Sequence, residues 1–130
     1  MKKLFLIAIV FLLATAACEA PDKAISKQDG MYLVDTAQIE NEIAGYAGPT
    51  PVTIYIKDRR IVKVVMQDNY DGRRYNQAVR EGICNAWDGK SLEEAATMEV
   101  DAVSGATYTS NAVVENVRLG VTYFMEKRKK

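Results

Sequence analysis

Two neighbouring segments with alternating apolar residues constrain the fold of this chain most strongly. Apolar and polar side chains alternate over 52–57 and again over 61–67, on either side of a short charged loop at 58–60. A period of two with β-branched side chains is typical of half-buried strands, and a short loop between them indicates an antiparallel pair. We therefore predict a β-hairpin whose core face carries Val52, Ile54, Ile56, Val62, Val64 and Met66.

Three later segments have helical patterns. Over 73–87 apolar residues recur every three or four positions, although Gly82 costs about 1 kcal/mol relative to Ala and is a place for the helix to bend or stop. Ser91 and Glu94 have the spacing of a capping box at the start of a short helix over 91–97. A last helix is predicted over 110–127, with one apolar face made of Val113, Val117, Val121 and Phe124.

The segments before the hairpin have weaker signals. A short first strand is predicted over 30–35, whereas helix and strand both remain possible over 37–44. The stretch 45–51 contains two Gly and two Pro and is predicted as a turn. The fold class that follows is α+β, a small antiparallel sheet with helices packed on one face. The last helix is expected to press its apolar face onto the sheet and so to hold its own N-terminus in place.

The N-terminus has the pattern of an export signal. Lysines precede an apolar run over 4–13, and small residues then lead to Cys18; the run is too short for a comfortable transmembrane helix. Cleavage before Cys18 would make a lipoprotein with a lipid on that thiol, and ordinary cleavage among the small residues would leave a secreted or periplasmic protein. We favour the lipoprotein, although Thr15 stands where Leu is usual. The predicted organisation is a signal peptide over 1–17, a flexible tether over 18–29 and a domain over 30–130.

Composition excludes several classes of function. Removal of residues 1–17 takes two lysines from a balanced set of 17 basic and 17 acidic residues, so the remaining protein is slightly acidic and nucleic acid is not an expected partner. The chain has no His, which excludes His-ligated haem, nearly all zinc sites and Ser-His-Asp catalysis. No metal site is predicted, and redox chemistry needs an imported cofactor. Cys84 is predicted to be a small buried hydrophobic residue.

The stretch 101–110, D-A-V-S-G-A-T-Y-T-S, combines hydroxyl side chains with small residues just before the last predicted helix. A helix N-terminus offers unpaired N–H groups that suit a phosphate, and small residues let another molecule approach the backbone closely. A hydroxyl there can donate a hydrogen bond to a phosphate or accept it covalently. The structural alternative is that Thr109 or Ser110 simply caps the helix.

Asp101, the run Ser104-Gly105-Ala106-Thr107 and the following Thr109 closely resemble the flavinylation motif of the FMN-binding domain family. That family includes the flavin-carrying subunits of the Rnf and Nqr ion-pumping complexes and stand-alone envelope proteins. The resemblance extends over about 31–124 and includes a second, weaker match, G-Y-A-G-P at 45–49. It implies that FMN is attached to Thr107 through a phosphoester, by a flavin transferase that uses FAD as donor. It also implies that the other residues of this motif lie at the cofactor.

The resemblance leaves the environment of the flavin ring open. The larger relatives have a Glu-Thr-Pro-Gly segment near the ring, and this chain has N-Y-D-G-R at 69–73 in its place. Candidates to stack on the ring are Tyr46, Tyr55, Trp87 and Tyr108, although aromatic residues like these more often serve core or turn packing.

Two further roles are expected at the motif. Nothing basic stands next to Thr107 in the sequence, so its activation is expected from the transferase. Asp101 is expected to hold the loop by accepting backbone N–H bonds or to help the transferase bind; an ordinary turn Asp is the alternative.

The sequence thus predicts an extracytoplasmic electron carrier with covalent FMN, working between membrane or envelope redox partners. One alternative is a binding module that holds flavin non-covalently, or a flavin-free structural lipoprotein. Another is an enzyme with its own small-molecule reductase activity, against which the absence of His and of a second cofactor motif argues.

Overall fold

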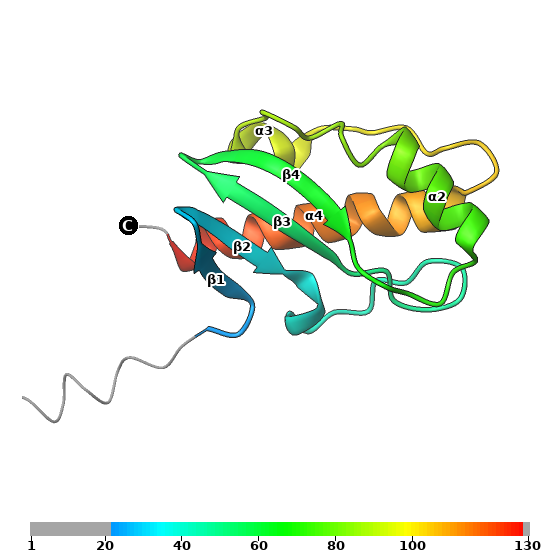
Figure 1. Cartoon of the computed structure of the whole chain (residues 1–130), viewed down its shortest axis with the longest axis horizontal. Coiled ribbons are helices and arrows are strands. Elements are labelled where there is room, and N and C mark those ends of the chain that lie inside the picture. The colour runs from blue at the N-terminus through cyan, green and yellow to red at the C-terminus, as the bar shows by residue number, and fades with distance from the viewer. Residues whose placement is uncertain (1–21, 129–130) are drawn as a thin grey trace, which may run out of the picture.

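The computed structural model describes residues 22–128, so the predicted signal peptide and Cys18 lie outside the described residues. One antiparallel sheet has the strand order β1-β2-β3-β4, formed by β1 (Ile25–Gln28), β2 (Met31–Asp35), β3 (Val52–Lys57) and β4 (Arg60–Met66). A 3₁₀ turn, η1 (Thr36–Gln38), follows β2, and the helices are α2 (Arg73–Gly82), α3 (Leu92–Thr97) and α4 (Thr107–Lys127). Figure 1 shows α4 crossing behind the sheet, with α2 and α3 beside it. The α+β class with helices on one face is confirmed.

The predicted hairpin is present, with one correction on β4. Val52, Ile54 and Ile56 are buried, but Ile61 rather than Val62 joins Val64 and Met66 on the core face. Tyr55 lies opposite Lys63 while Ile56 lies opposite Ile61, so Val62 is an extra residue at a β-bulge and is 41% exposed. A bulge reverses the inward and outward alternation on one side of it, which the alternating pattern alone does not reveal.

The loop of this hairpin has two residues, not the three predicted. Asp58 and Arg59 have φ of 53° and 61°, which is the left-handed conformation that a two-residue hairpin turn of the I′ class requires at both positions. Arg60 is the first residue of β4.

Strand β1 lies within the range predicted as a tether, so the folded domain begins before residue 30. It pairs with β2 through a turn at Asp29 and Gly30, which have φ of 53° and 78°. An Asp-Gly pair between two short segments is a signal for such a hairpin, but 25–28 lacks the alternating pattern that would have identified a strand. The segment before β1 is also ordered, because the Asp22 carboxylate accepts the Tyr123 hydroxyl at 2.8 Å.

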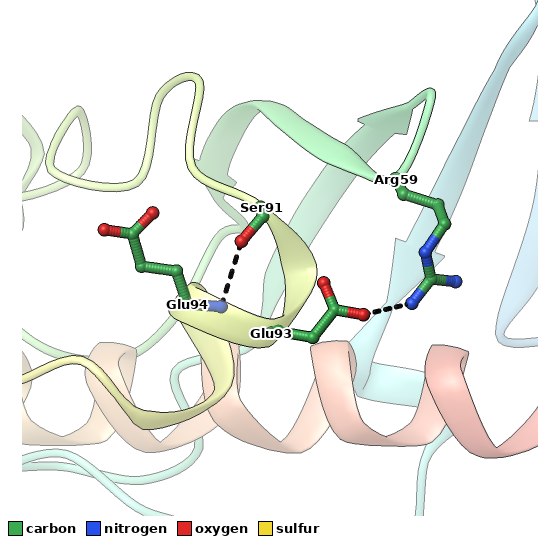
Figure 2. Close-up of polar contacts among 4 residues, drawn as sticks. All are labelled: Arg59, Ser91, Glu93 and Glu94. Atoms are coloured by element: carbon green, nitrogen blue, oxygen red, sulfur yellow. Dashed lines mark hydrogen bonds and ion pairs between the residues drawn. The ribbon is translucent and has the colours of Figure 1, made fainter.

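The short helix α3 is the clearest local prediction that the structure confirms. The Ser91 hydroxyl accepts the N–H of Glu94 at 3.1 Å, as its predicted cap role requires, and Figure 2 shows this bond. Figure 2 also shows Glu93 paired with Arg59 of the hairpin turn. Both side chains are largely exposed, so this pair adds little stability.

Helix α2 ends at Gly82 instead of continuing to Trp87, which lies in the core at 1% exposure. A Cβ at Gly82 would lie 2.7 Å from the Val103 side chain, so the end of α2 packs closely on the segment before α4. Cys84 is buried as predicted, and burial raises the pKa of its thiol to about 11.

Helix α4 is the long element of the core. Val113, Val117 and Val121 are fully buried and Phe124 is 4% exposed, which confirms the predicted apolar face. The helix contacts β2, β3, α2 and α3. Among the described residues, no helix has the length and apolar character needed to span a bilayer.

Candidate functional site

The site is built around the start of α4. This helix begins at Thr107, earlier than the predicted Ser110, and its N-cap residue is Ala106. The preceding Gly105 has φ of +84°, a left-handed conformation that glycine adopts without strain. The turn therefore delivers the chain into α4 so that Thr107 stands in its first turn with an exposed side chain.

The prediction that Thr109 or Ser110 caps the helix is wrong, because both residues lie inside α4 and are buried at 1% and 0%. Within the part of the chain that the structure describes, no side chain caps the start of the helix. Its first N–H groups are therefore without a side-chain acceptor beside Thr107, the arrangement that favours an anion at a helix N-terminus.

Ser110 closes the loop that leads to Thr107. Its Oγ accepts the N–H of Val103 at 3.0 Å, and the N–H of Ala106 donates to the Val103 carbonyl at 2.9 Å. Asp101 does not have the loop-holding role expected of it: its side chain is exposed and receives no hydrogen bond within residues 22–128. Ser104 is exposed as well, so of the motif hydroxyls only those of Ser104 and Thr107 face solvent.

Thr109 bonds to a buried carboxylate that the sequence analysis did not identify. The Thr109 hydroxyl donates to Asp71 Oδ2 at 2.5 Å, and the same carboxylate accepts the N–H groups of Tyr46 at 3.1 Å and Ala47 at 2.6 Å. Asp71 is only 4% exposed. Burial alone would raise its pKa, but the hydrogen bonds from Thr109, Ala47 and Tyr46 outweigh burial and lower the pKa below the ordinary 3.8.

The only sequence signal for Asp71 was its place in N-Y-D-G-R, the segment that stands where relatives approach the flavin ring. An Asp before a Gly is an ordinary loop residue. Its partners lie 24 to 38 residues away along the chain, so no local pattern could have revealed them.

A cleft of about 280 Å³ opens beside the start of α4. Tyr46, Tyr75 and Tyr108 form its aromatic walls, and the rest of the lining comes from Gly105, Ala106, Thr107 and Thr109. The Tyr46 ring lies 5.9 Å from the Tyr75 ring and 6.2 Å from the Tyr108 ring, measured between centroids. Tyr46 and Tyr108 are each 68% exposed, an unusual exposure for aromatic rings that line one cavity.

The structure separates the four aromatic candidates named from the sequence. Tyr46 and Tyr108 line the cleft, whereas Trp87 is a core residue and Tyr55 lies on the sheet with the Lys63 ammonium 4.6 Å from its ring. Tyr75 was not among these candidates. It stands in the first turn of α2, where it packs against the core and also lines the cleft.

These features fit a flavin nucleotide. Aromatic side chains prefer to stack on planar rings, and the cleft offers three of them around one opening. Its volume lies just below the range of about 300–1,000 Å³ that is usual for small-molecule sites, so it suits part of a nucleotide with the rest outside. The uncapped first turn of α4 offers N–H groups to a phosphate, and Thr107, which lines the cleft, stands in that turn with an exposed side chain.

Comparison with known families supports the same cofactor. Residues 45–122 match the family model of the FMN-binding domain, and this region includes every residue that lines the cleft. A search of curated proteins returns no match. Because the family match covers more than half of the chain, the protein belongs to the FMN-binding domain family, and FMN is its cofactor.

Proposed function

We propose that this protein is an extracytoplasmic electron carrier in which FMN is attached through a phosphoester to Thr107. One observation supports the attachment point above all: Thr107 combines an exposed hydroxyl with a place on the cleft. Thr109 lines the cleft but its hydroxyl is buried against Asp71, and Ser104 is exposed but is not a lining residue. The motif therefore offers one hydroxyl that is both accessible and next to the stacking rings.

Attachment is a phosphoryl transfer to the Thr107 hydroxyl. Thr107 Oγ forms a bond to the phosphorus of the FMN half of FAD, the phosphoanhydride bond of FAD breaks, and AMP leaves. The hydroxyl proton passes to a base of the flavin transferase, because the residues that line the cleft include no basic side chain. The protein contributes position: Gly105 and Ala106 add no bulk beside the reacting oxygen.

Once FMN is bound, its ring supplies one- and two-electron redox chemistry. The three tyrosines would hold the ring, and the first-turn N–H groups of α4 would receive the phosphate. The open cleft suits exchange of electrons with a partner at the surface. Apart from threonine hydroxyls and tyrosines, the cleft-lining residues carry no acid–base or nucleophilic group, which favours an electron carrier over an enzyme with a substrate of its own.

The cellular setting is proposed from the N-terminal sequence. The signal-like run and Cys18 support export and lipid anchoring to a membrane of the cell envelope. The expected partners are the flavin transferase and redox proteins of the membrane or envelope. A covalent link suits this location, since a dissociable flavin would be lost from an exported protein.

The attachment is tested by Thr107→Ala, with Thr122→Ala as the matched control at an exposed position of the same helix. The protein is co-expressed with a flavin transferase, and covalent flavin is measured by intact mass and by in-gel fluorescence after denaturation. We expect Thr107→Ala to lose all covalent flavin and Thr122→Ala to retain it. Covalent flavin that persists in Thr107→Ala would rule out Thr107 as the acceptor.

The tyrosine cleft also favours a second candidate, a module that binds FMN non-covalently, because three rings can stack on a flavin without a covalent bond. The two candidates separate on denaturation of the co-expressed protein. Yellow colour that stays with the chain supports covalent attachment, and colour that is released supports the non-covalent module.

A further inference from the structure

We propose that Asp71 is a positioning residue, which locks the tyrosine wall of the cleft to the helix turn that carries Thr107. The proposal rests on the proposed function, because it assigns Asp71 a role in flavin attachment and in the environment of the ring. Asp71 is 4% exposed and is not among the residues that line the cleft, so it acts through other residues rather than by touching the flavin.

The Asp71 carboxylate joins two segments that are distant in sequence. Oδ2 accepts the Thr109 hydroxyl of α4 and the N–H of Tyr46, and Oδ1 accepts the N–H of Ala47. Both oxygens are thus used, and each bond involves an ionised acceptor, which makes it stronger than a bond between neutral groups. The loop at 45–48 and the first turn of α4 are held at one point.

Each bonded segment carries a functional part of the cleft. The N–H of Tyr46 belongs to the residue whose ring forms one wall. Thr109 stands two residues after Thr107 in the same turn of α4. The third wall is connected too, because the Asn76 side chain of α2 donates to the Asp71 carbonyl at 3.0 Å and Tyr75 is its neighbour in that helix.

The packing around Asp71 shows that the loop at 45–48 rests directly on the carboxylate. A Cβ at Gly45 would lie 2.3 Å from Asp71 Oδ2 and 2.8 Å from the Thr50 side chain. No side chain fits there, so Gly45 is needed for the close approach that brings the Tyr46 and Ala47 N–H groups onto the oxygens. The contact between the loop at 45–48 and the Asp71 carboxylate is therefore a close-packed feature of the fold and not an incidental surface bond.

Loss of this contact should act on the flavin in two ways. A freed Tyr46 would no longer keep its place on the ring, which changes flavin fluorescence because a tyrosine in contact with the ring quenches it. A loosened first turn would present Thr107 less accurately to the transferase, and misplacement of about 1 Å can slow a positioned reaction about 100-fold.

The test compares Thr109→Val, which replaces the hydroxyl with a methyl group of similar size, with Thr109→Ser, which keeps it. Asp71→Asn is a second variant that leaves one acceptor oxygen. The matched control is Thr36→Val, because Thr36 of η1 is a fully buried threonine whose hydroxyl bonds to the backbone of Val52 in β3, and neither residue lines the cleft. This control also replaces a buried, hydrogen-bonded threonine hydroxyl with a methyl group, but its partners are backbone groups outside the cleft.

Three readouts are taken on the full chain. Amide hydrogen exchange of Tyr46 and Ala47 in the flavin-free protein measures the contact itself. The initial rate of FMN attachment by the transferase, per folded protein, and the fluorescence yield of the attached flavin measure its function. In Thr109→Val and Asp71→Asn we expect faster exchange at both amides, attachment slowed about tenfold and brighter flavin. Thr109→Ser should restore all three, and Thr36→Val should change none.

Two results would overturn the proposal: unchanged attachment and fluorescence in Thr109→Val, or equal changes in Thr36→Val. If the wild-type chain takes no covalent flavin at all, the proposed function fails. The exchange of Tyr46 and Ala47 then still decides whether Asp71 holds the loop, so the two failures are distinguishable.

Discussion

At the scale of single residues, burial divides four similar hydroxyls into different roles. Thr107 faces the cleft, Thr109 bonds to Asp71, Ser110 closes the loop at Val103, and Ser104 faces solvent. These residues lie within seven positions of one another and are chemically alike. Their roles differ only because their side chains face different ways relative to the core: an exposed hydroxyl can be an attachment point, whereas a buried one makes a structural hydrogen bond.

The ionisation of Asp71 makes a testable contribution to stability. Its pKa is lowered in the folded protein, since the bonds from Thr109, Ala47 and Tyr46 outweigh the effect of burial. A carboxyl group with a lowered folded pKa contributes stability above its unfolded pKa, and this contribution is lost as the pH falls through the folded value. We therefore expect the stability contributed by the ionised Asp71 carboxylate to decline progressively as the pH falls below about 4.

The measurement is urea unfolding between about pH 6 and pH 2, on wild type and Asp71→Asn. Asp71→Asn should be less stable at the upper end, and its stability should fall less steeply toward acid because one titrating group is gone. Identical pH slopes in the two proteins would contradict the assigned ionisation.

At the scale of elements, α4 connects the core to the site. Its C-terminal half packs on the sheet and its first turn carries Thr107, so the position of the sheet determines where the hydroxyl stands. Gly120 allows the close approach. A Cβ there would lie 2.6 Å from Ile54 Cδ1 and 3.0 Å from Thr36 Cγ2.

The substitution Gly120→Ala has two opposing effects on stability, a gain in helix propensity and a loss from steric crowding in the core. Alanine favours a helix over glycine by about 1 kcal/mol, but an extra methyl group in a filled core costs about 1–3 kcal/mol. Because Ile54 and Thr36 are both fully buried and cannot move into solvent, we expect the packing cost to exceed the helix gain, with a net loss of up to about 2 kcal/mol in the free energy of unfolding. Urea unfolding measures it, with Asn111→Ala at an exposed position of α4 as the control that changes stability by less than about 0.5 kcal/mol. If Gly120→Ala were more stable than wild type, Ile54 and Thr36 could move enough to accommodate the methyl group, and the prediction would be wrong.

At the scale of the whole molecule, the cleft and the start of the described chain lie at opposite ends of α4. Thr107 opens the helix, whereas Tyr123, near its C-terminus, holds Asp22. At about 1.5 Å per residue these two positions are about 24 Å apart along the axis. Figure 1 shows β1 beside the C-terminal end of α4 and α2 at the other end. If Cys18 carries the proposed lipid, the chain leaves the domain on the side away from the cleft, which leaves the flavin open to partners.

Because of this separation, we expect a substitution at the C-terminal end of α4 to leave the cleft at its N-terminal end unaffected. Tyr123→Phe removes the hydroxyl that Asp22 accepts, so we expect faster hydrogen exchange at Ala24, whose N–H also bonds to Asp22 at 2.9 Å. FMN attachment should stay within about twofold of wild type, because no cleft residue is touched. A large loss of attachment in Tyr123→Phe would show that the two ends are coupled.

Much of this protein follows from local sequence. The alternation over 52–57, the apolar face of α4 and the cap at Ser91 each depend on residues a few positions apart, so their patterns are readable without a structure. The motif at 101–107 is local as well, and its resemblance to a family identified FMN before any geometry was known. The weaker β1 and the bulge at Val62 were missed because neither changes a local pattern clearly.

Tertiary structure decided which residues form the cleft and how it is held together. Tyr46, Tyr75 and Tyr108 come from a loop and two helices, and the Asp71 carboxylate bonds to groups on two of these elements. Side-chain periodicity records which way a residue faces on its own element, but the meeting of distant elements depends on how the whole core packs. For that reason the sequence alone identified the hydroxyl-bearing turn, and only the folded chain showed that Thr107 is open to a flavin while Thr109 is committed to Asp71.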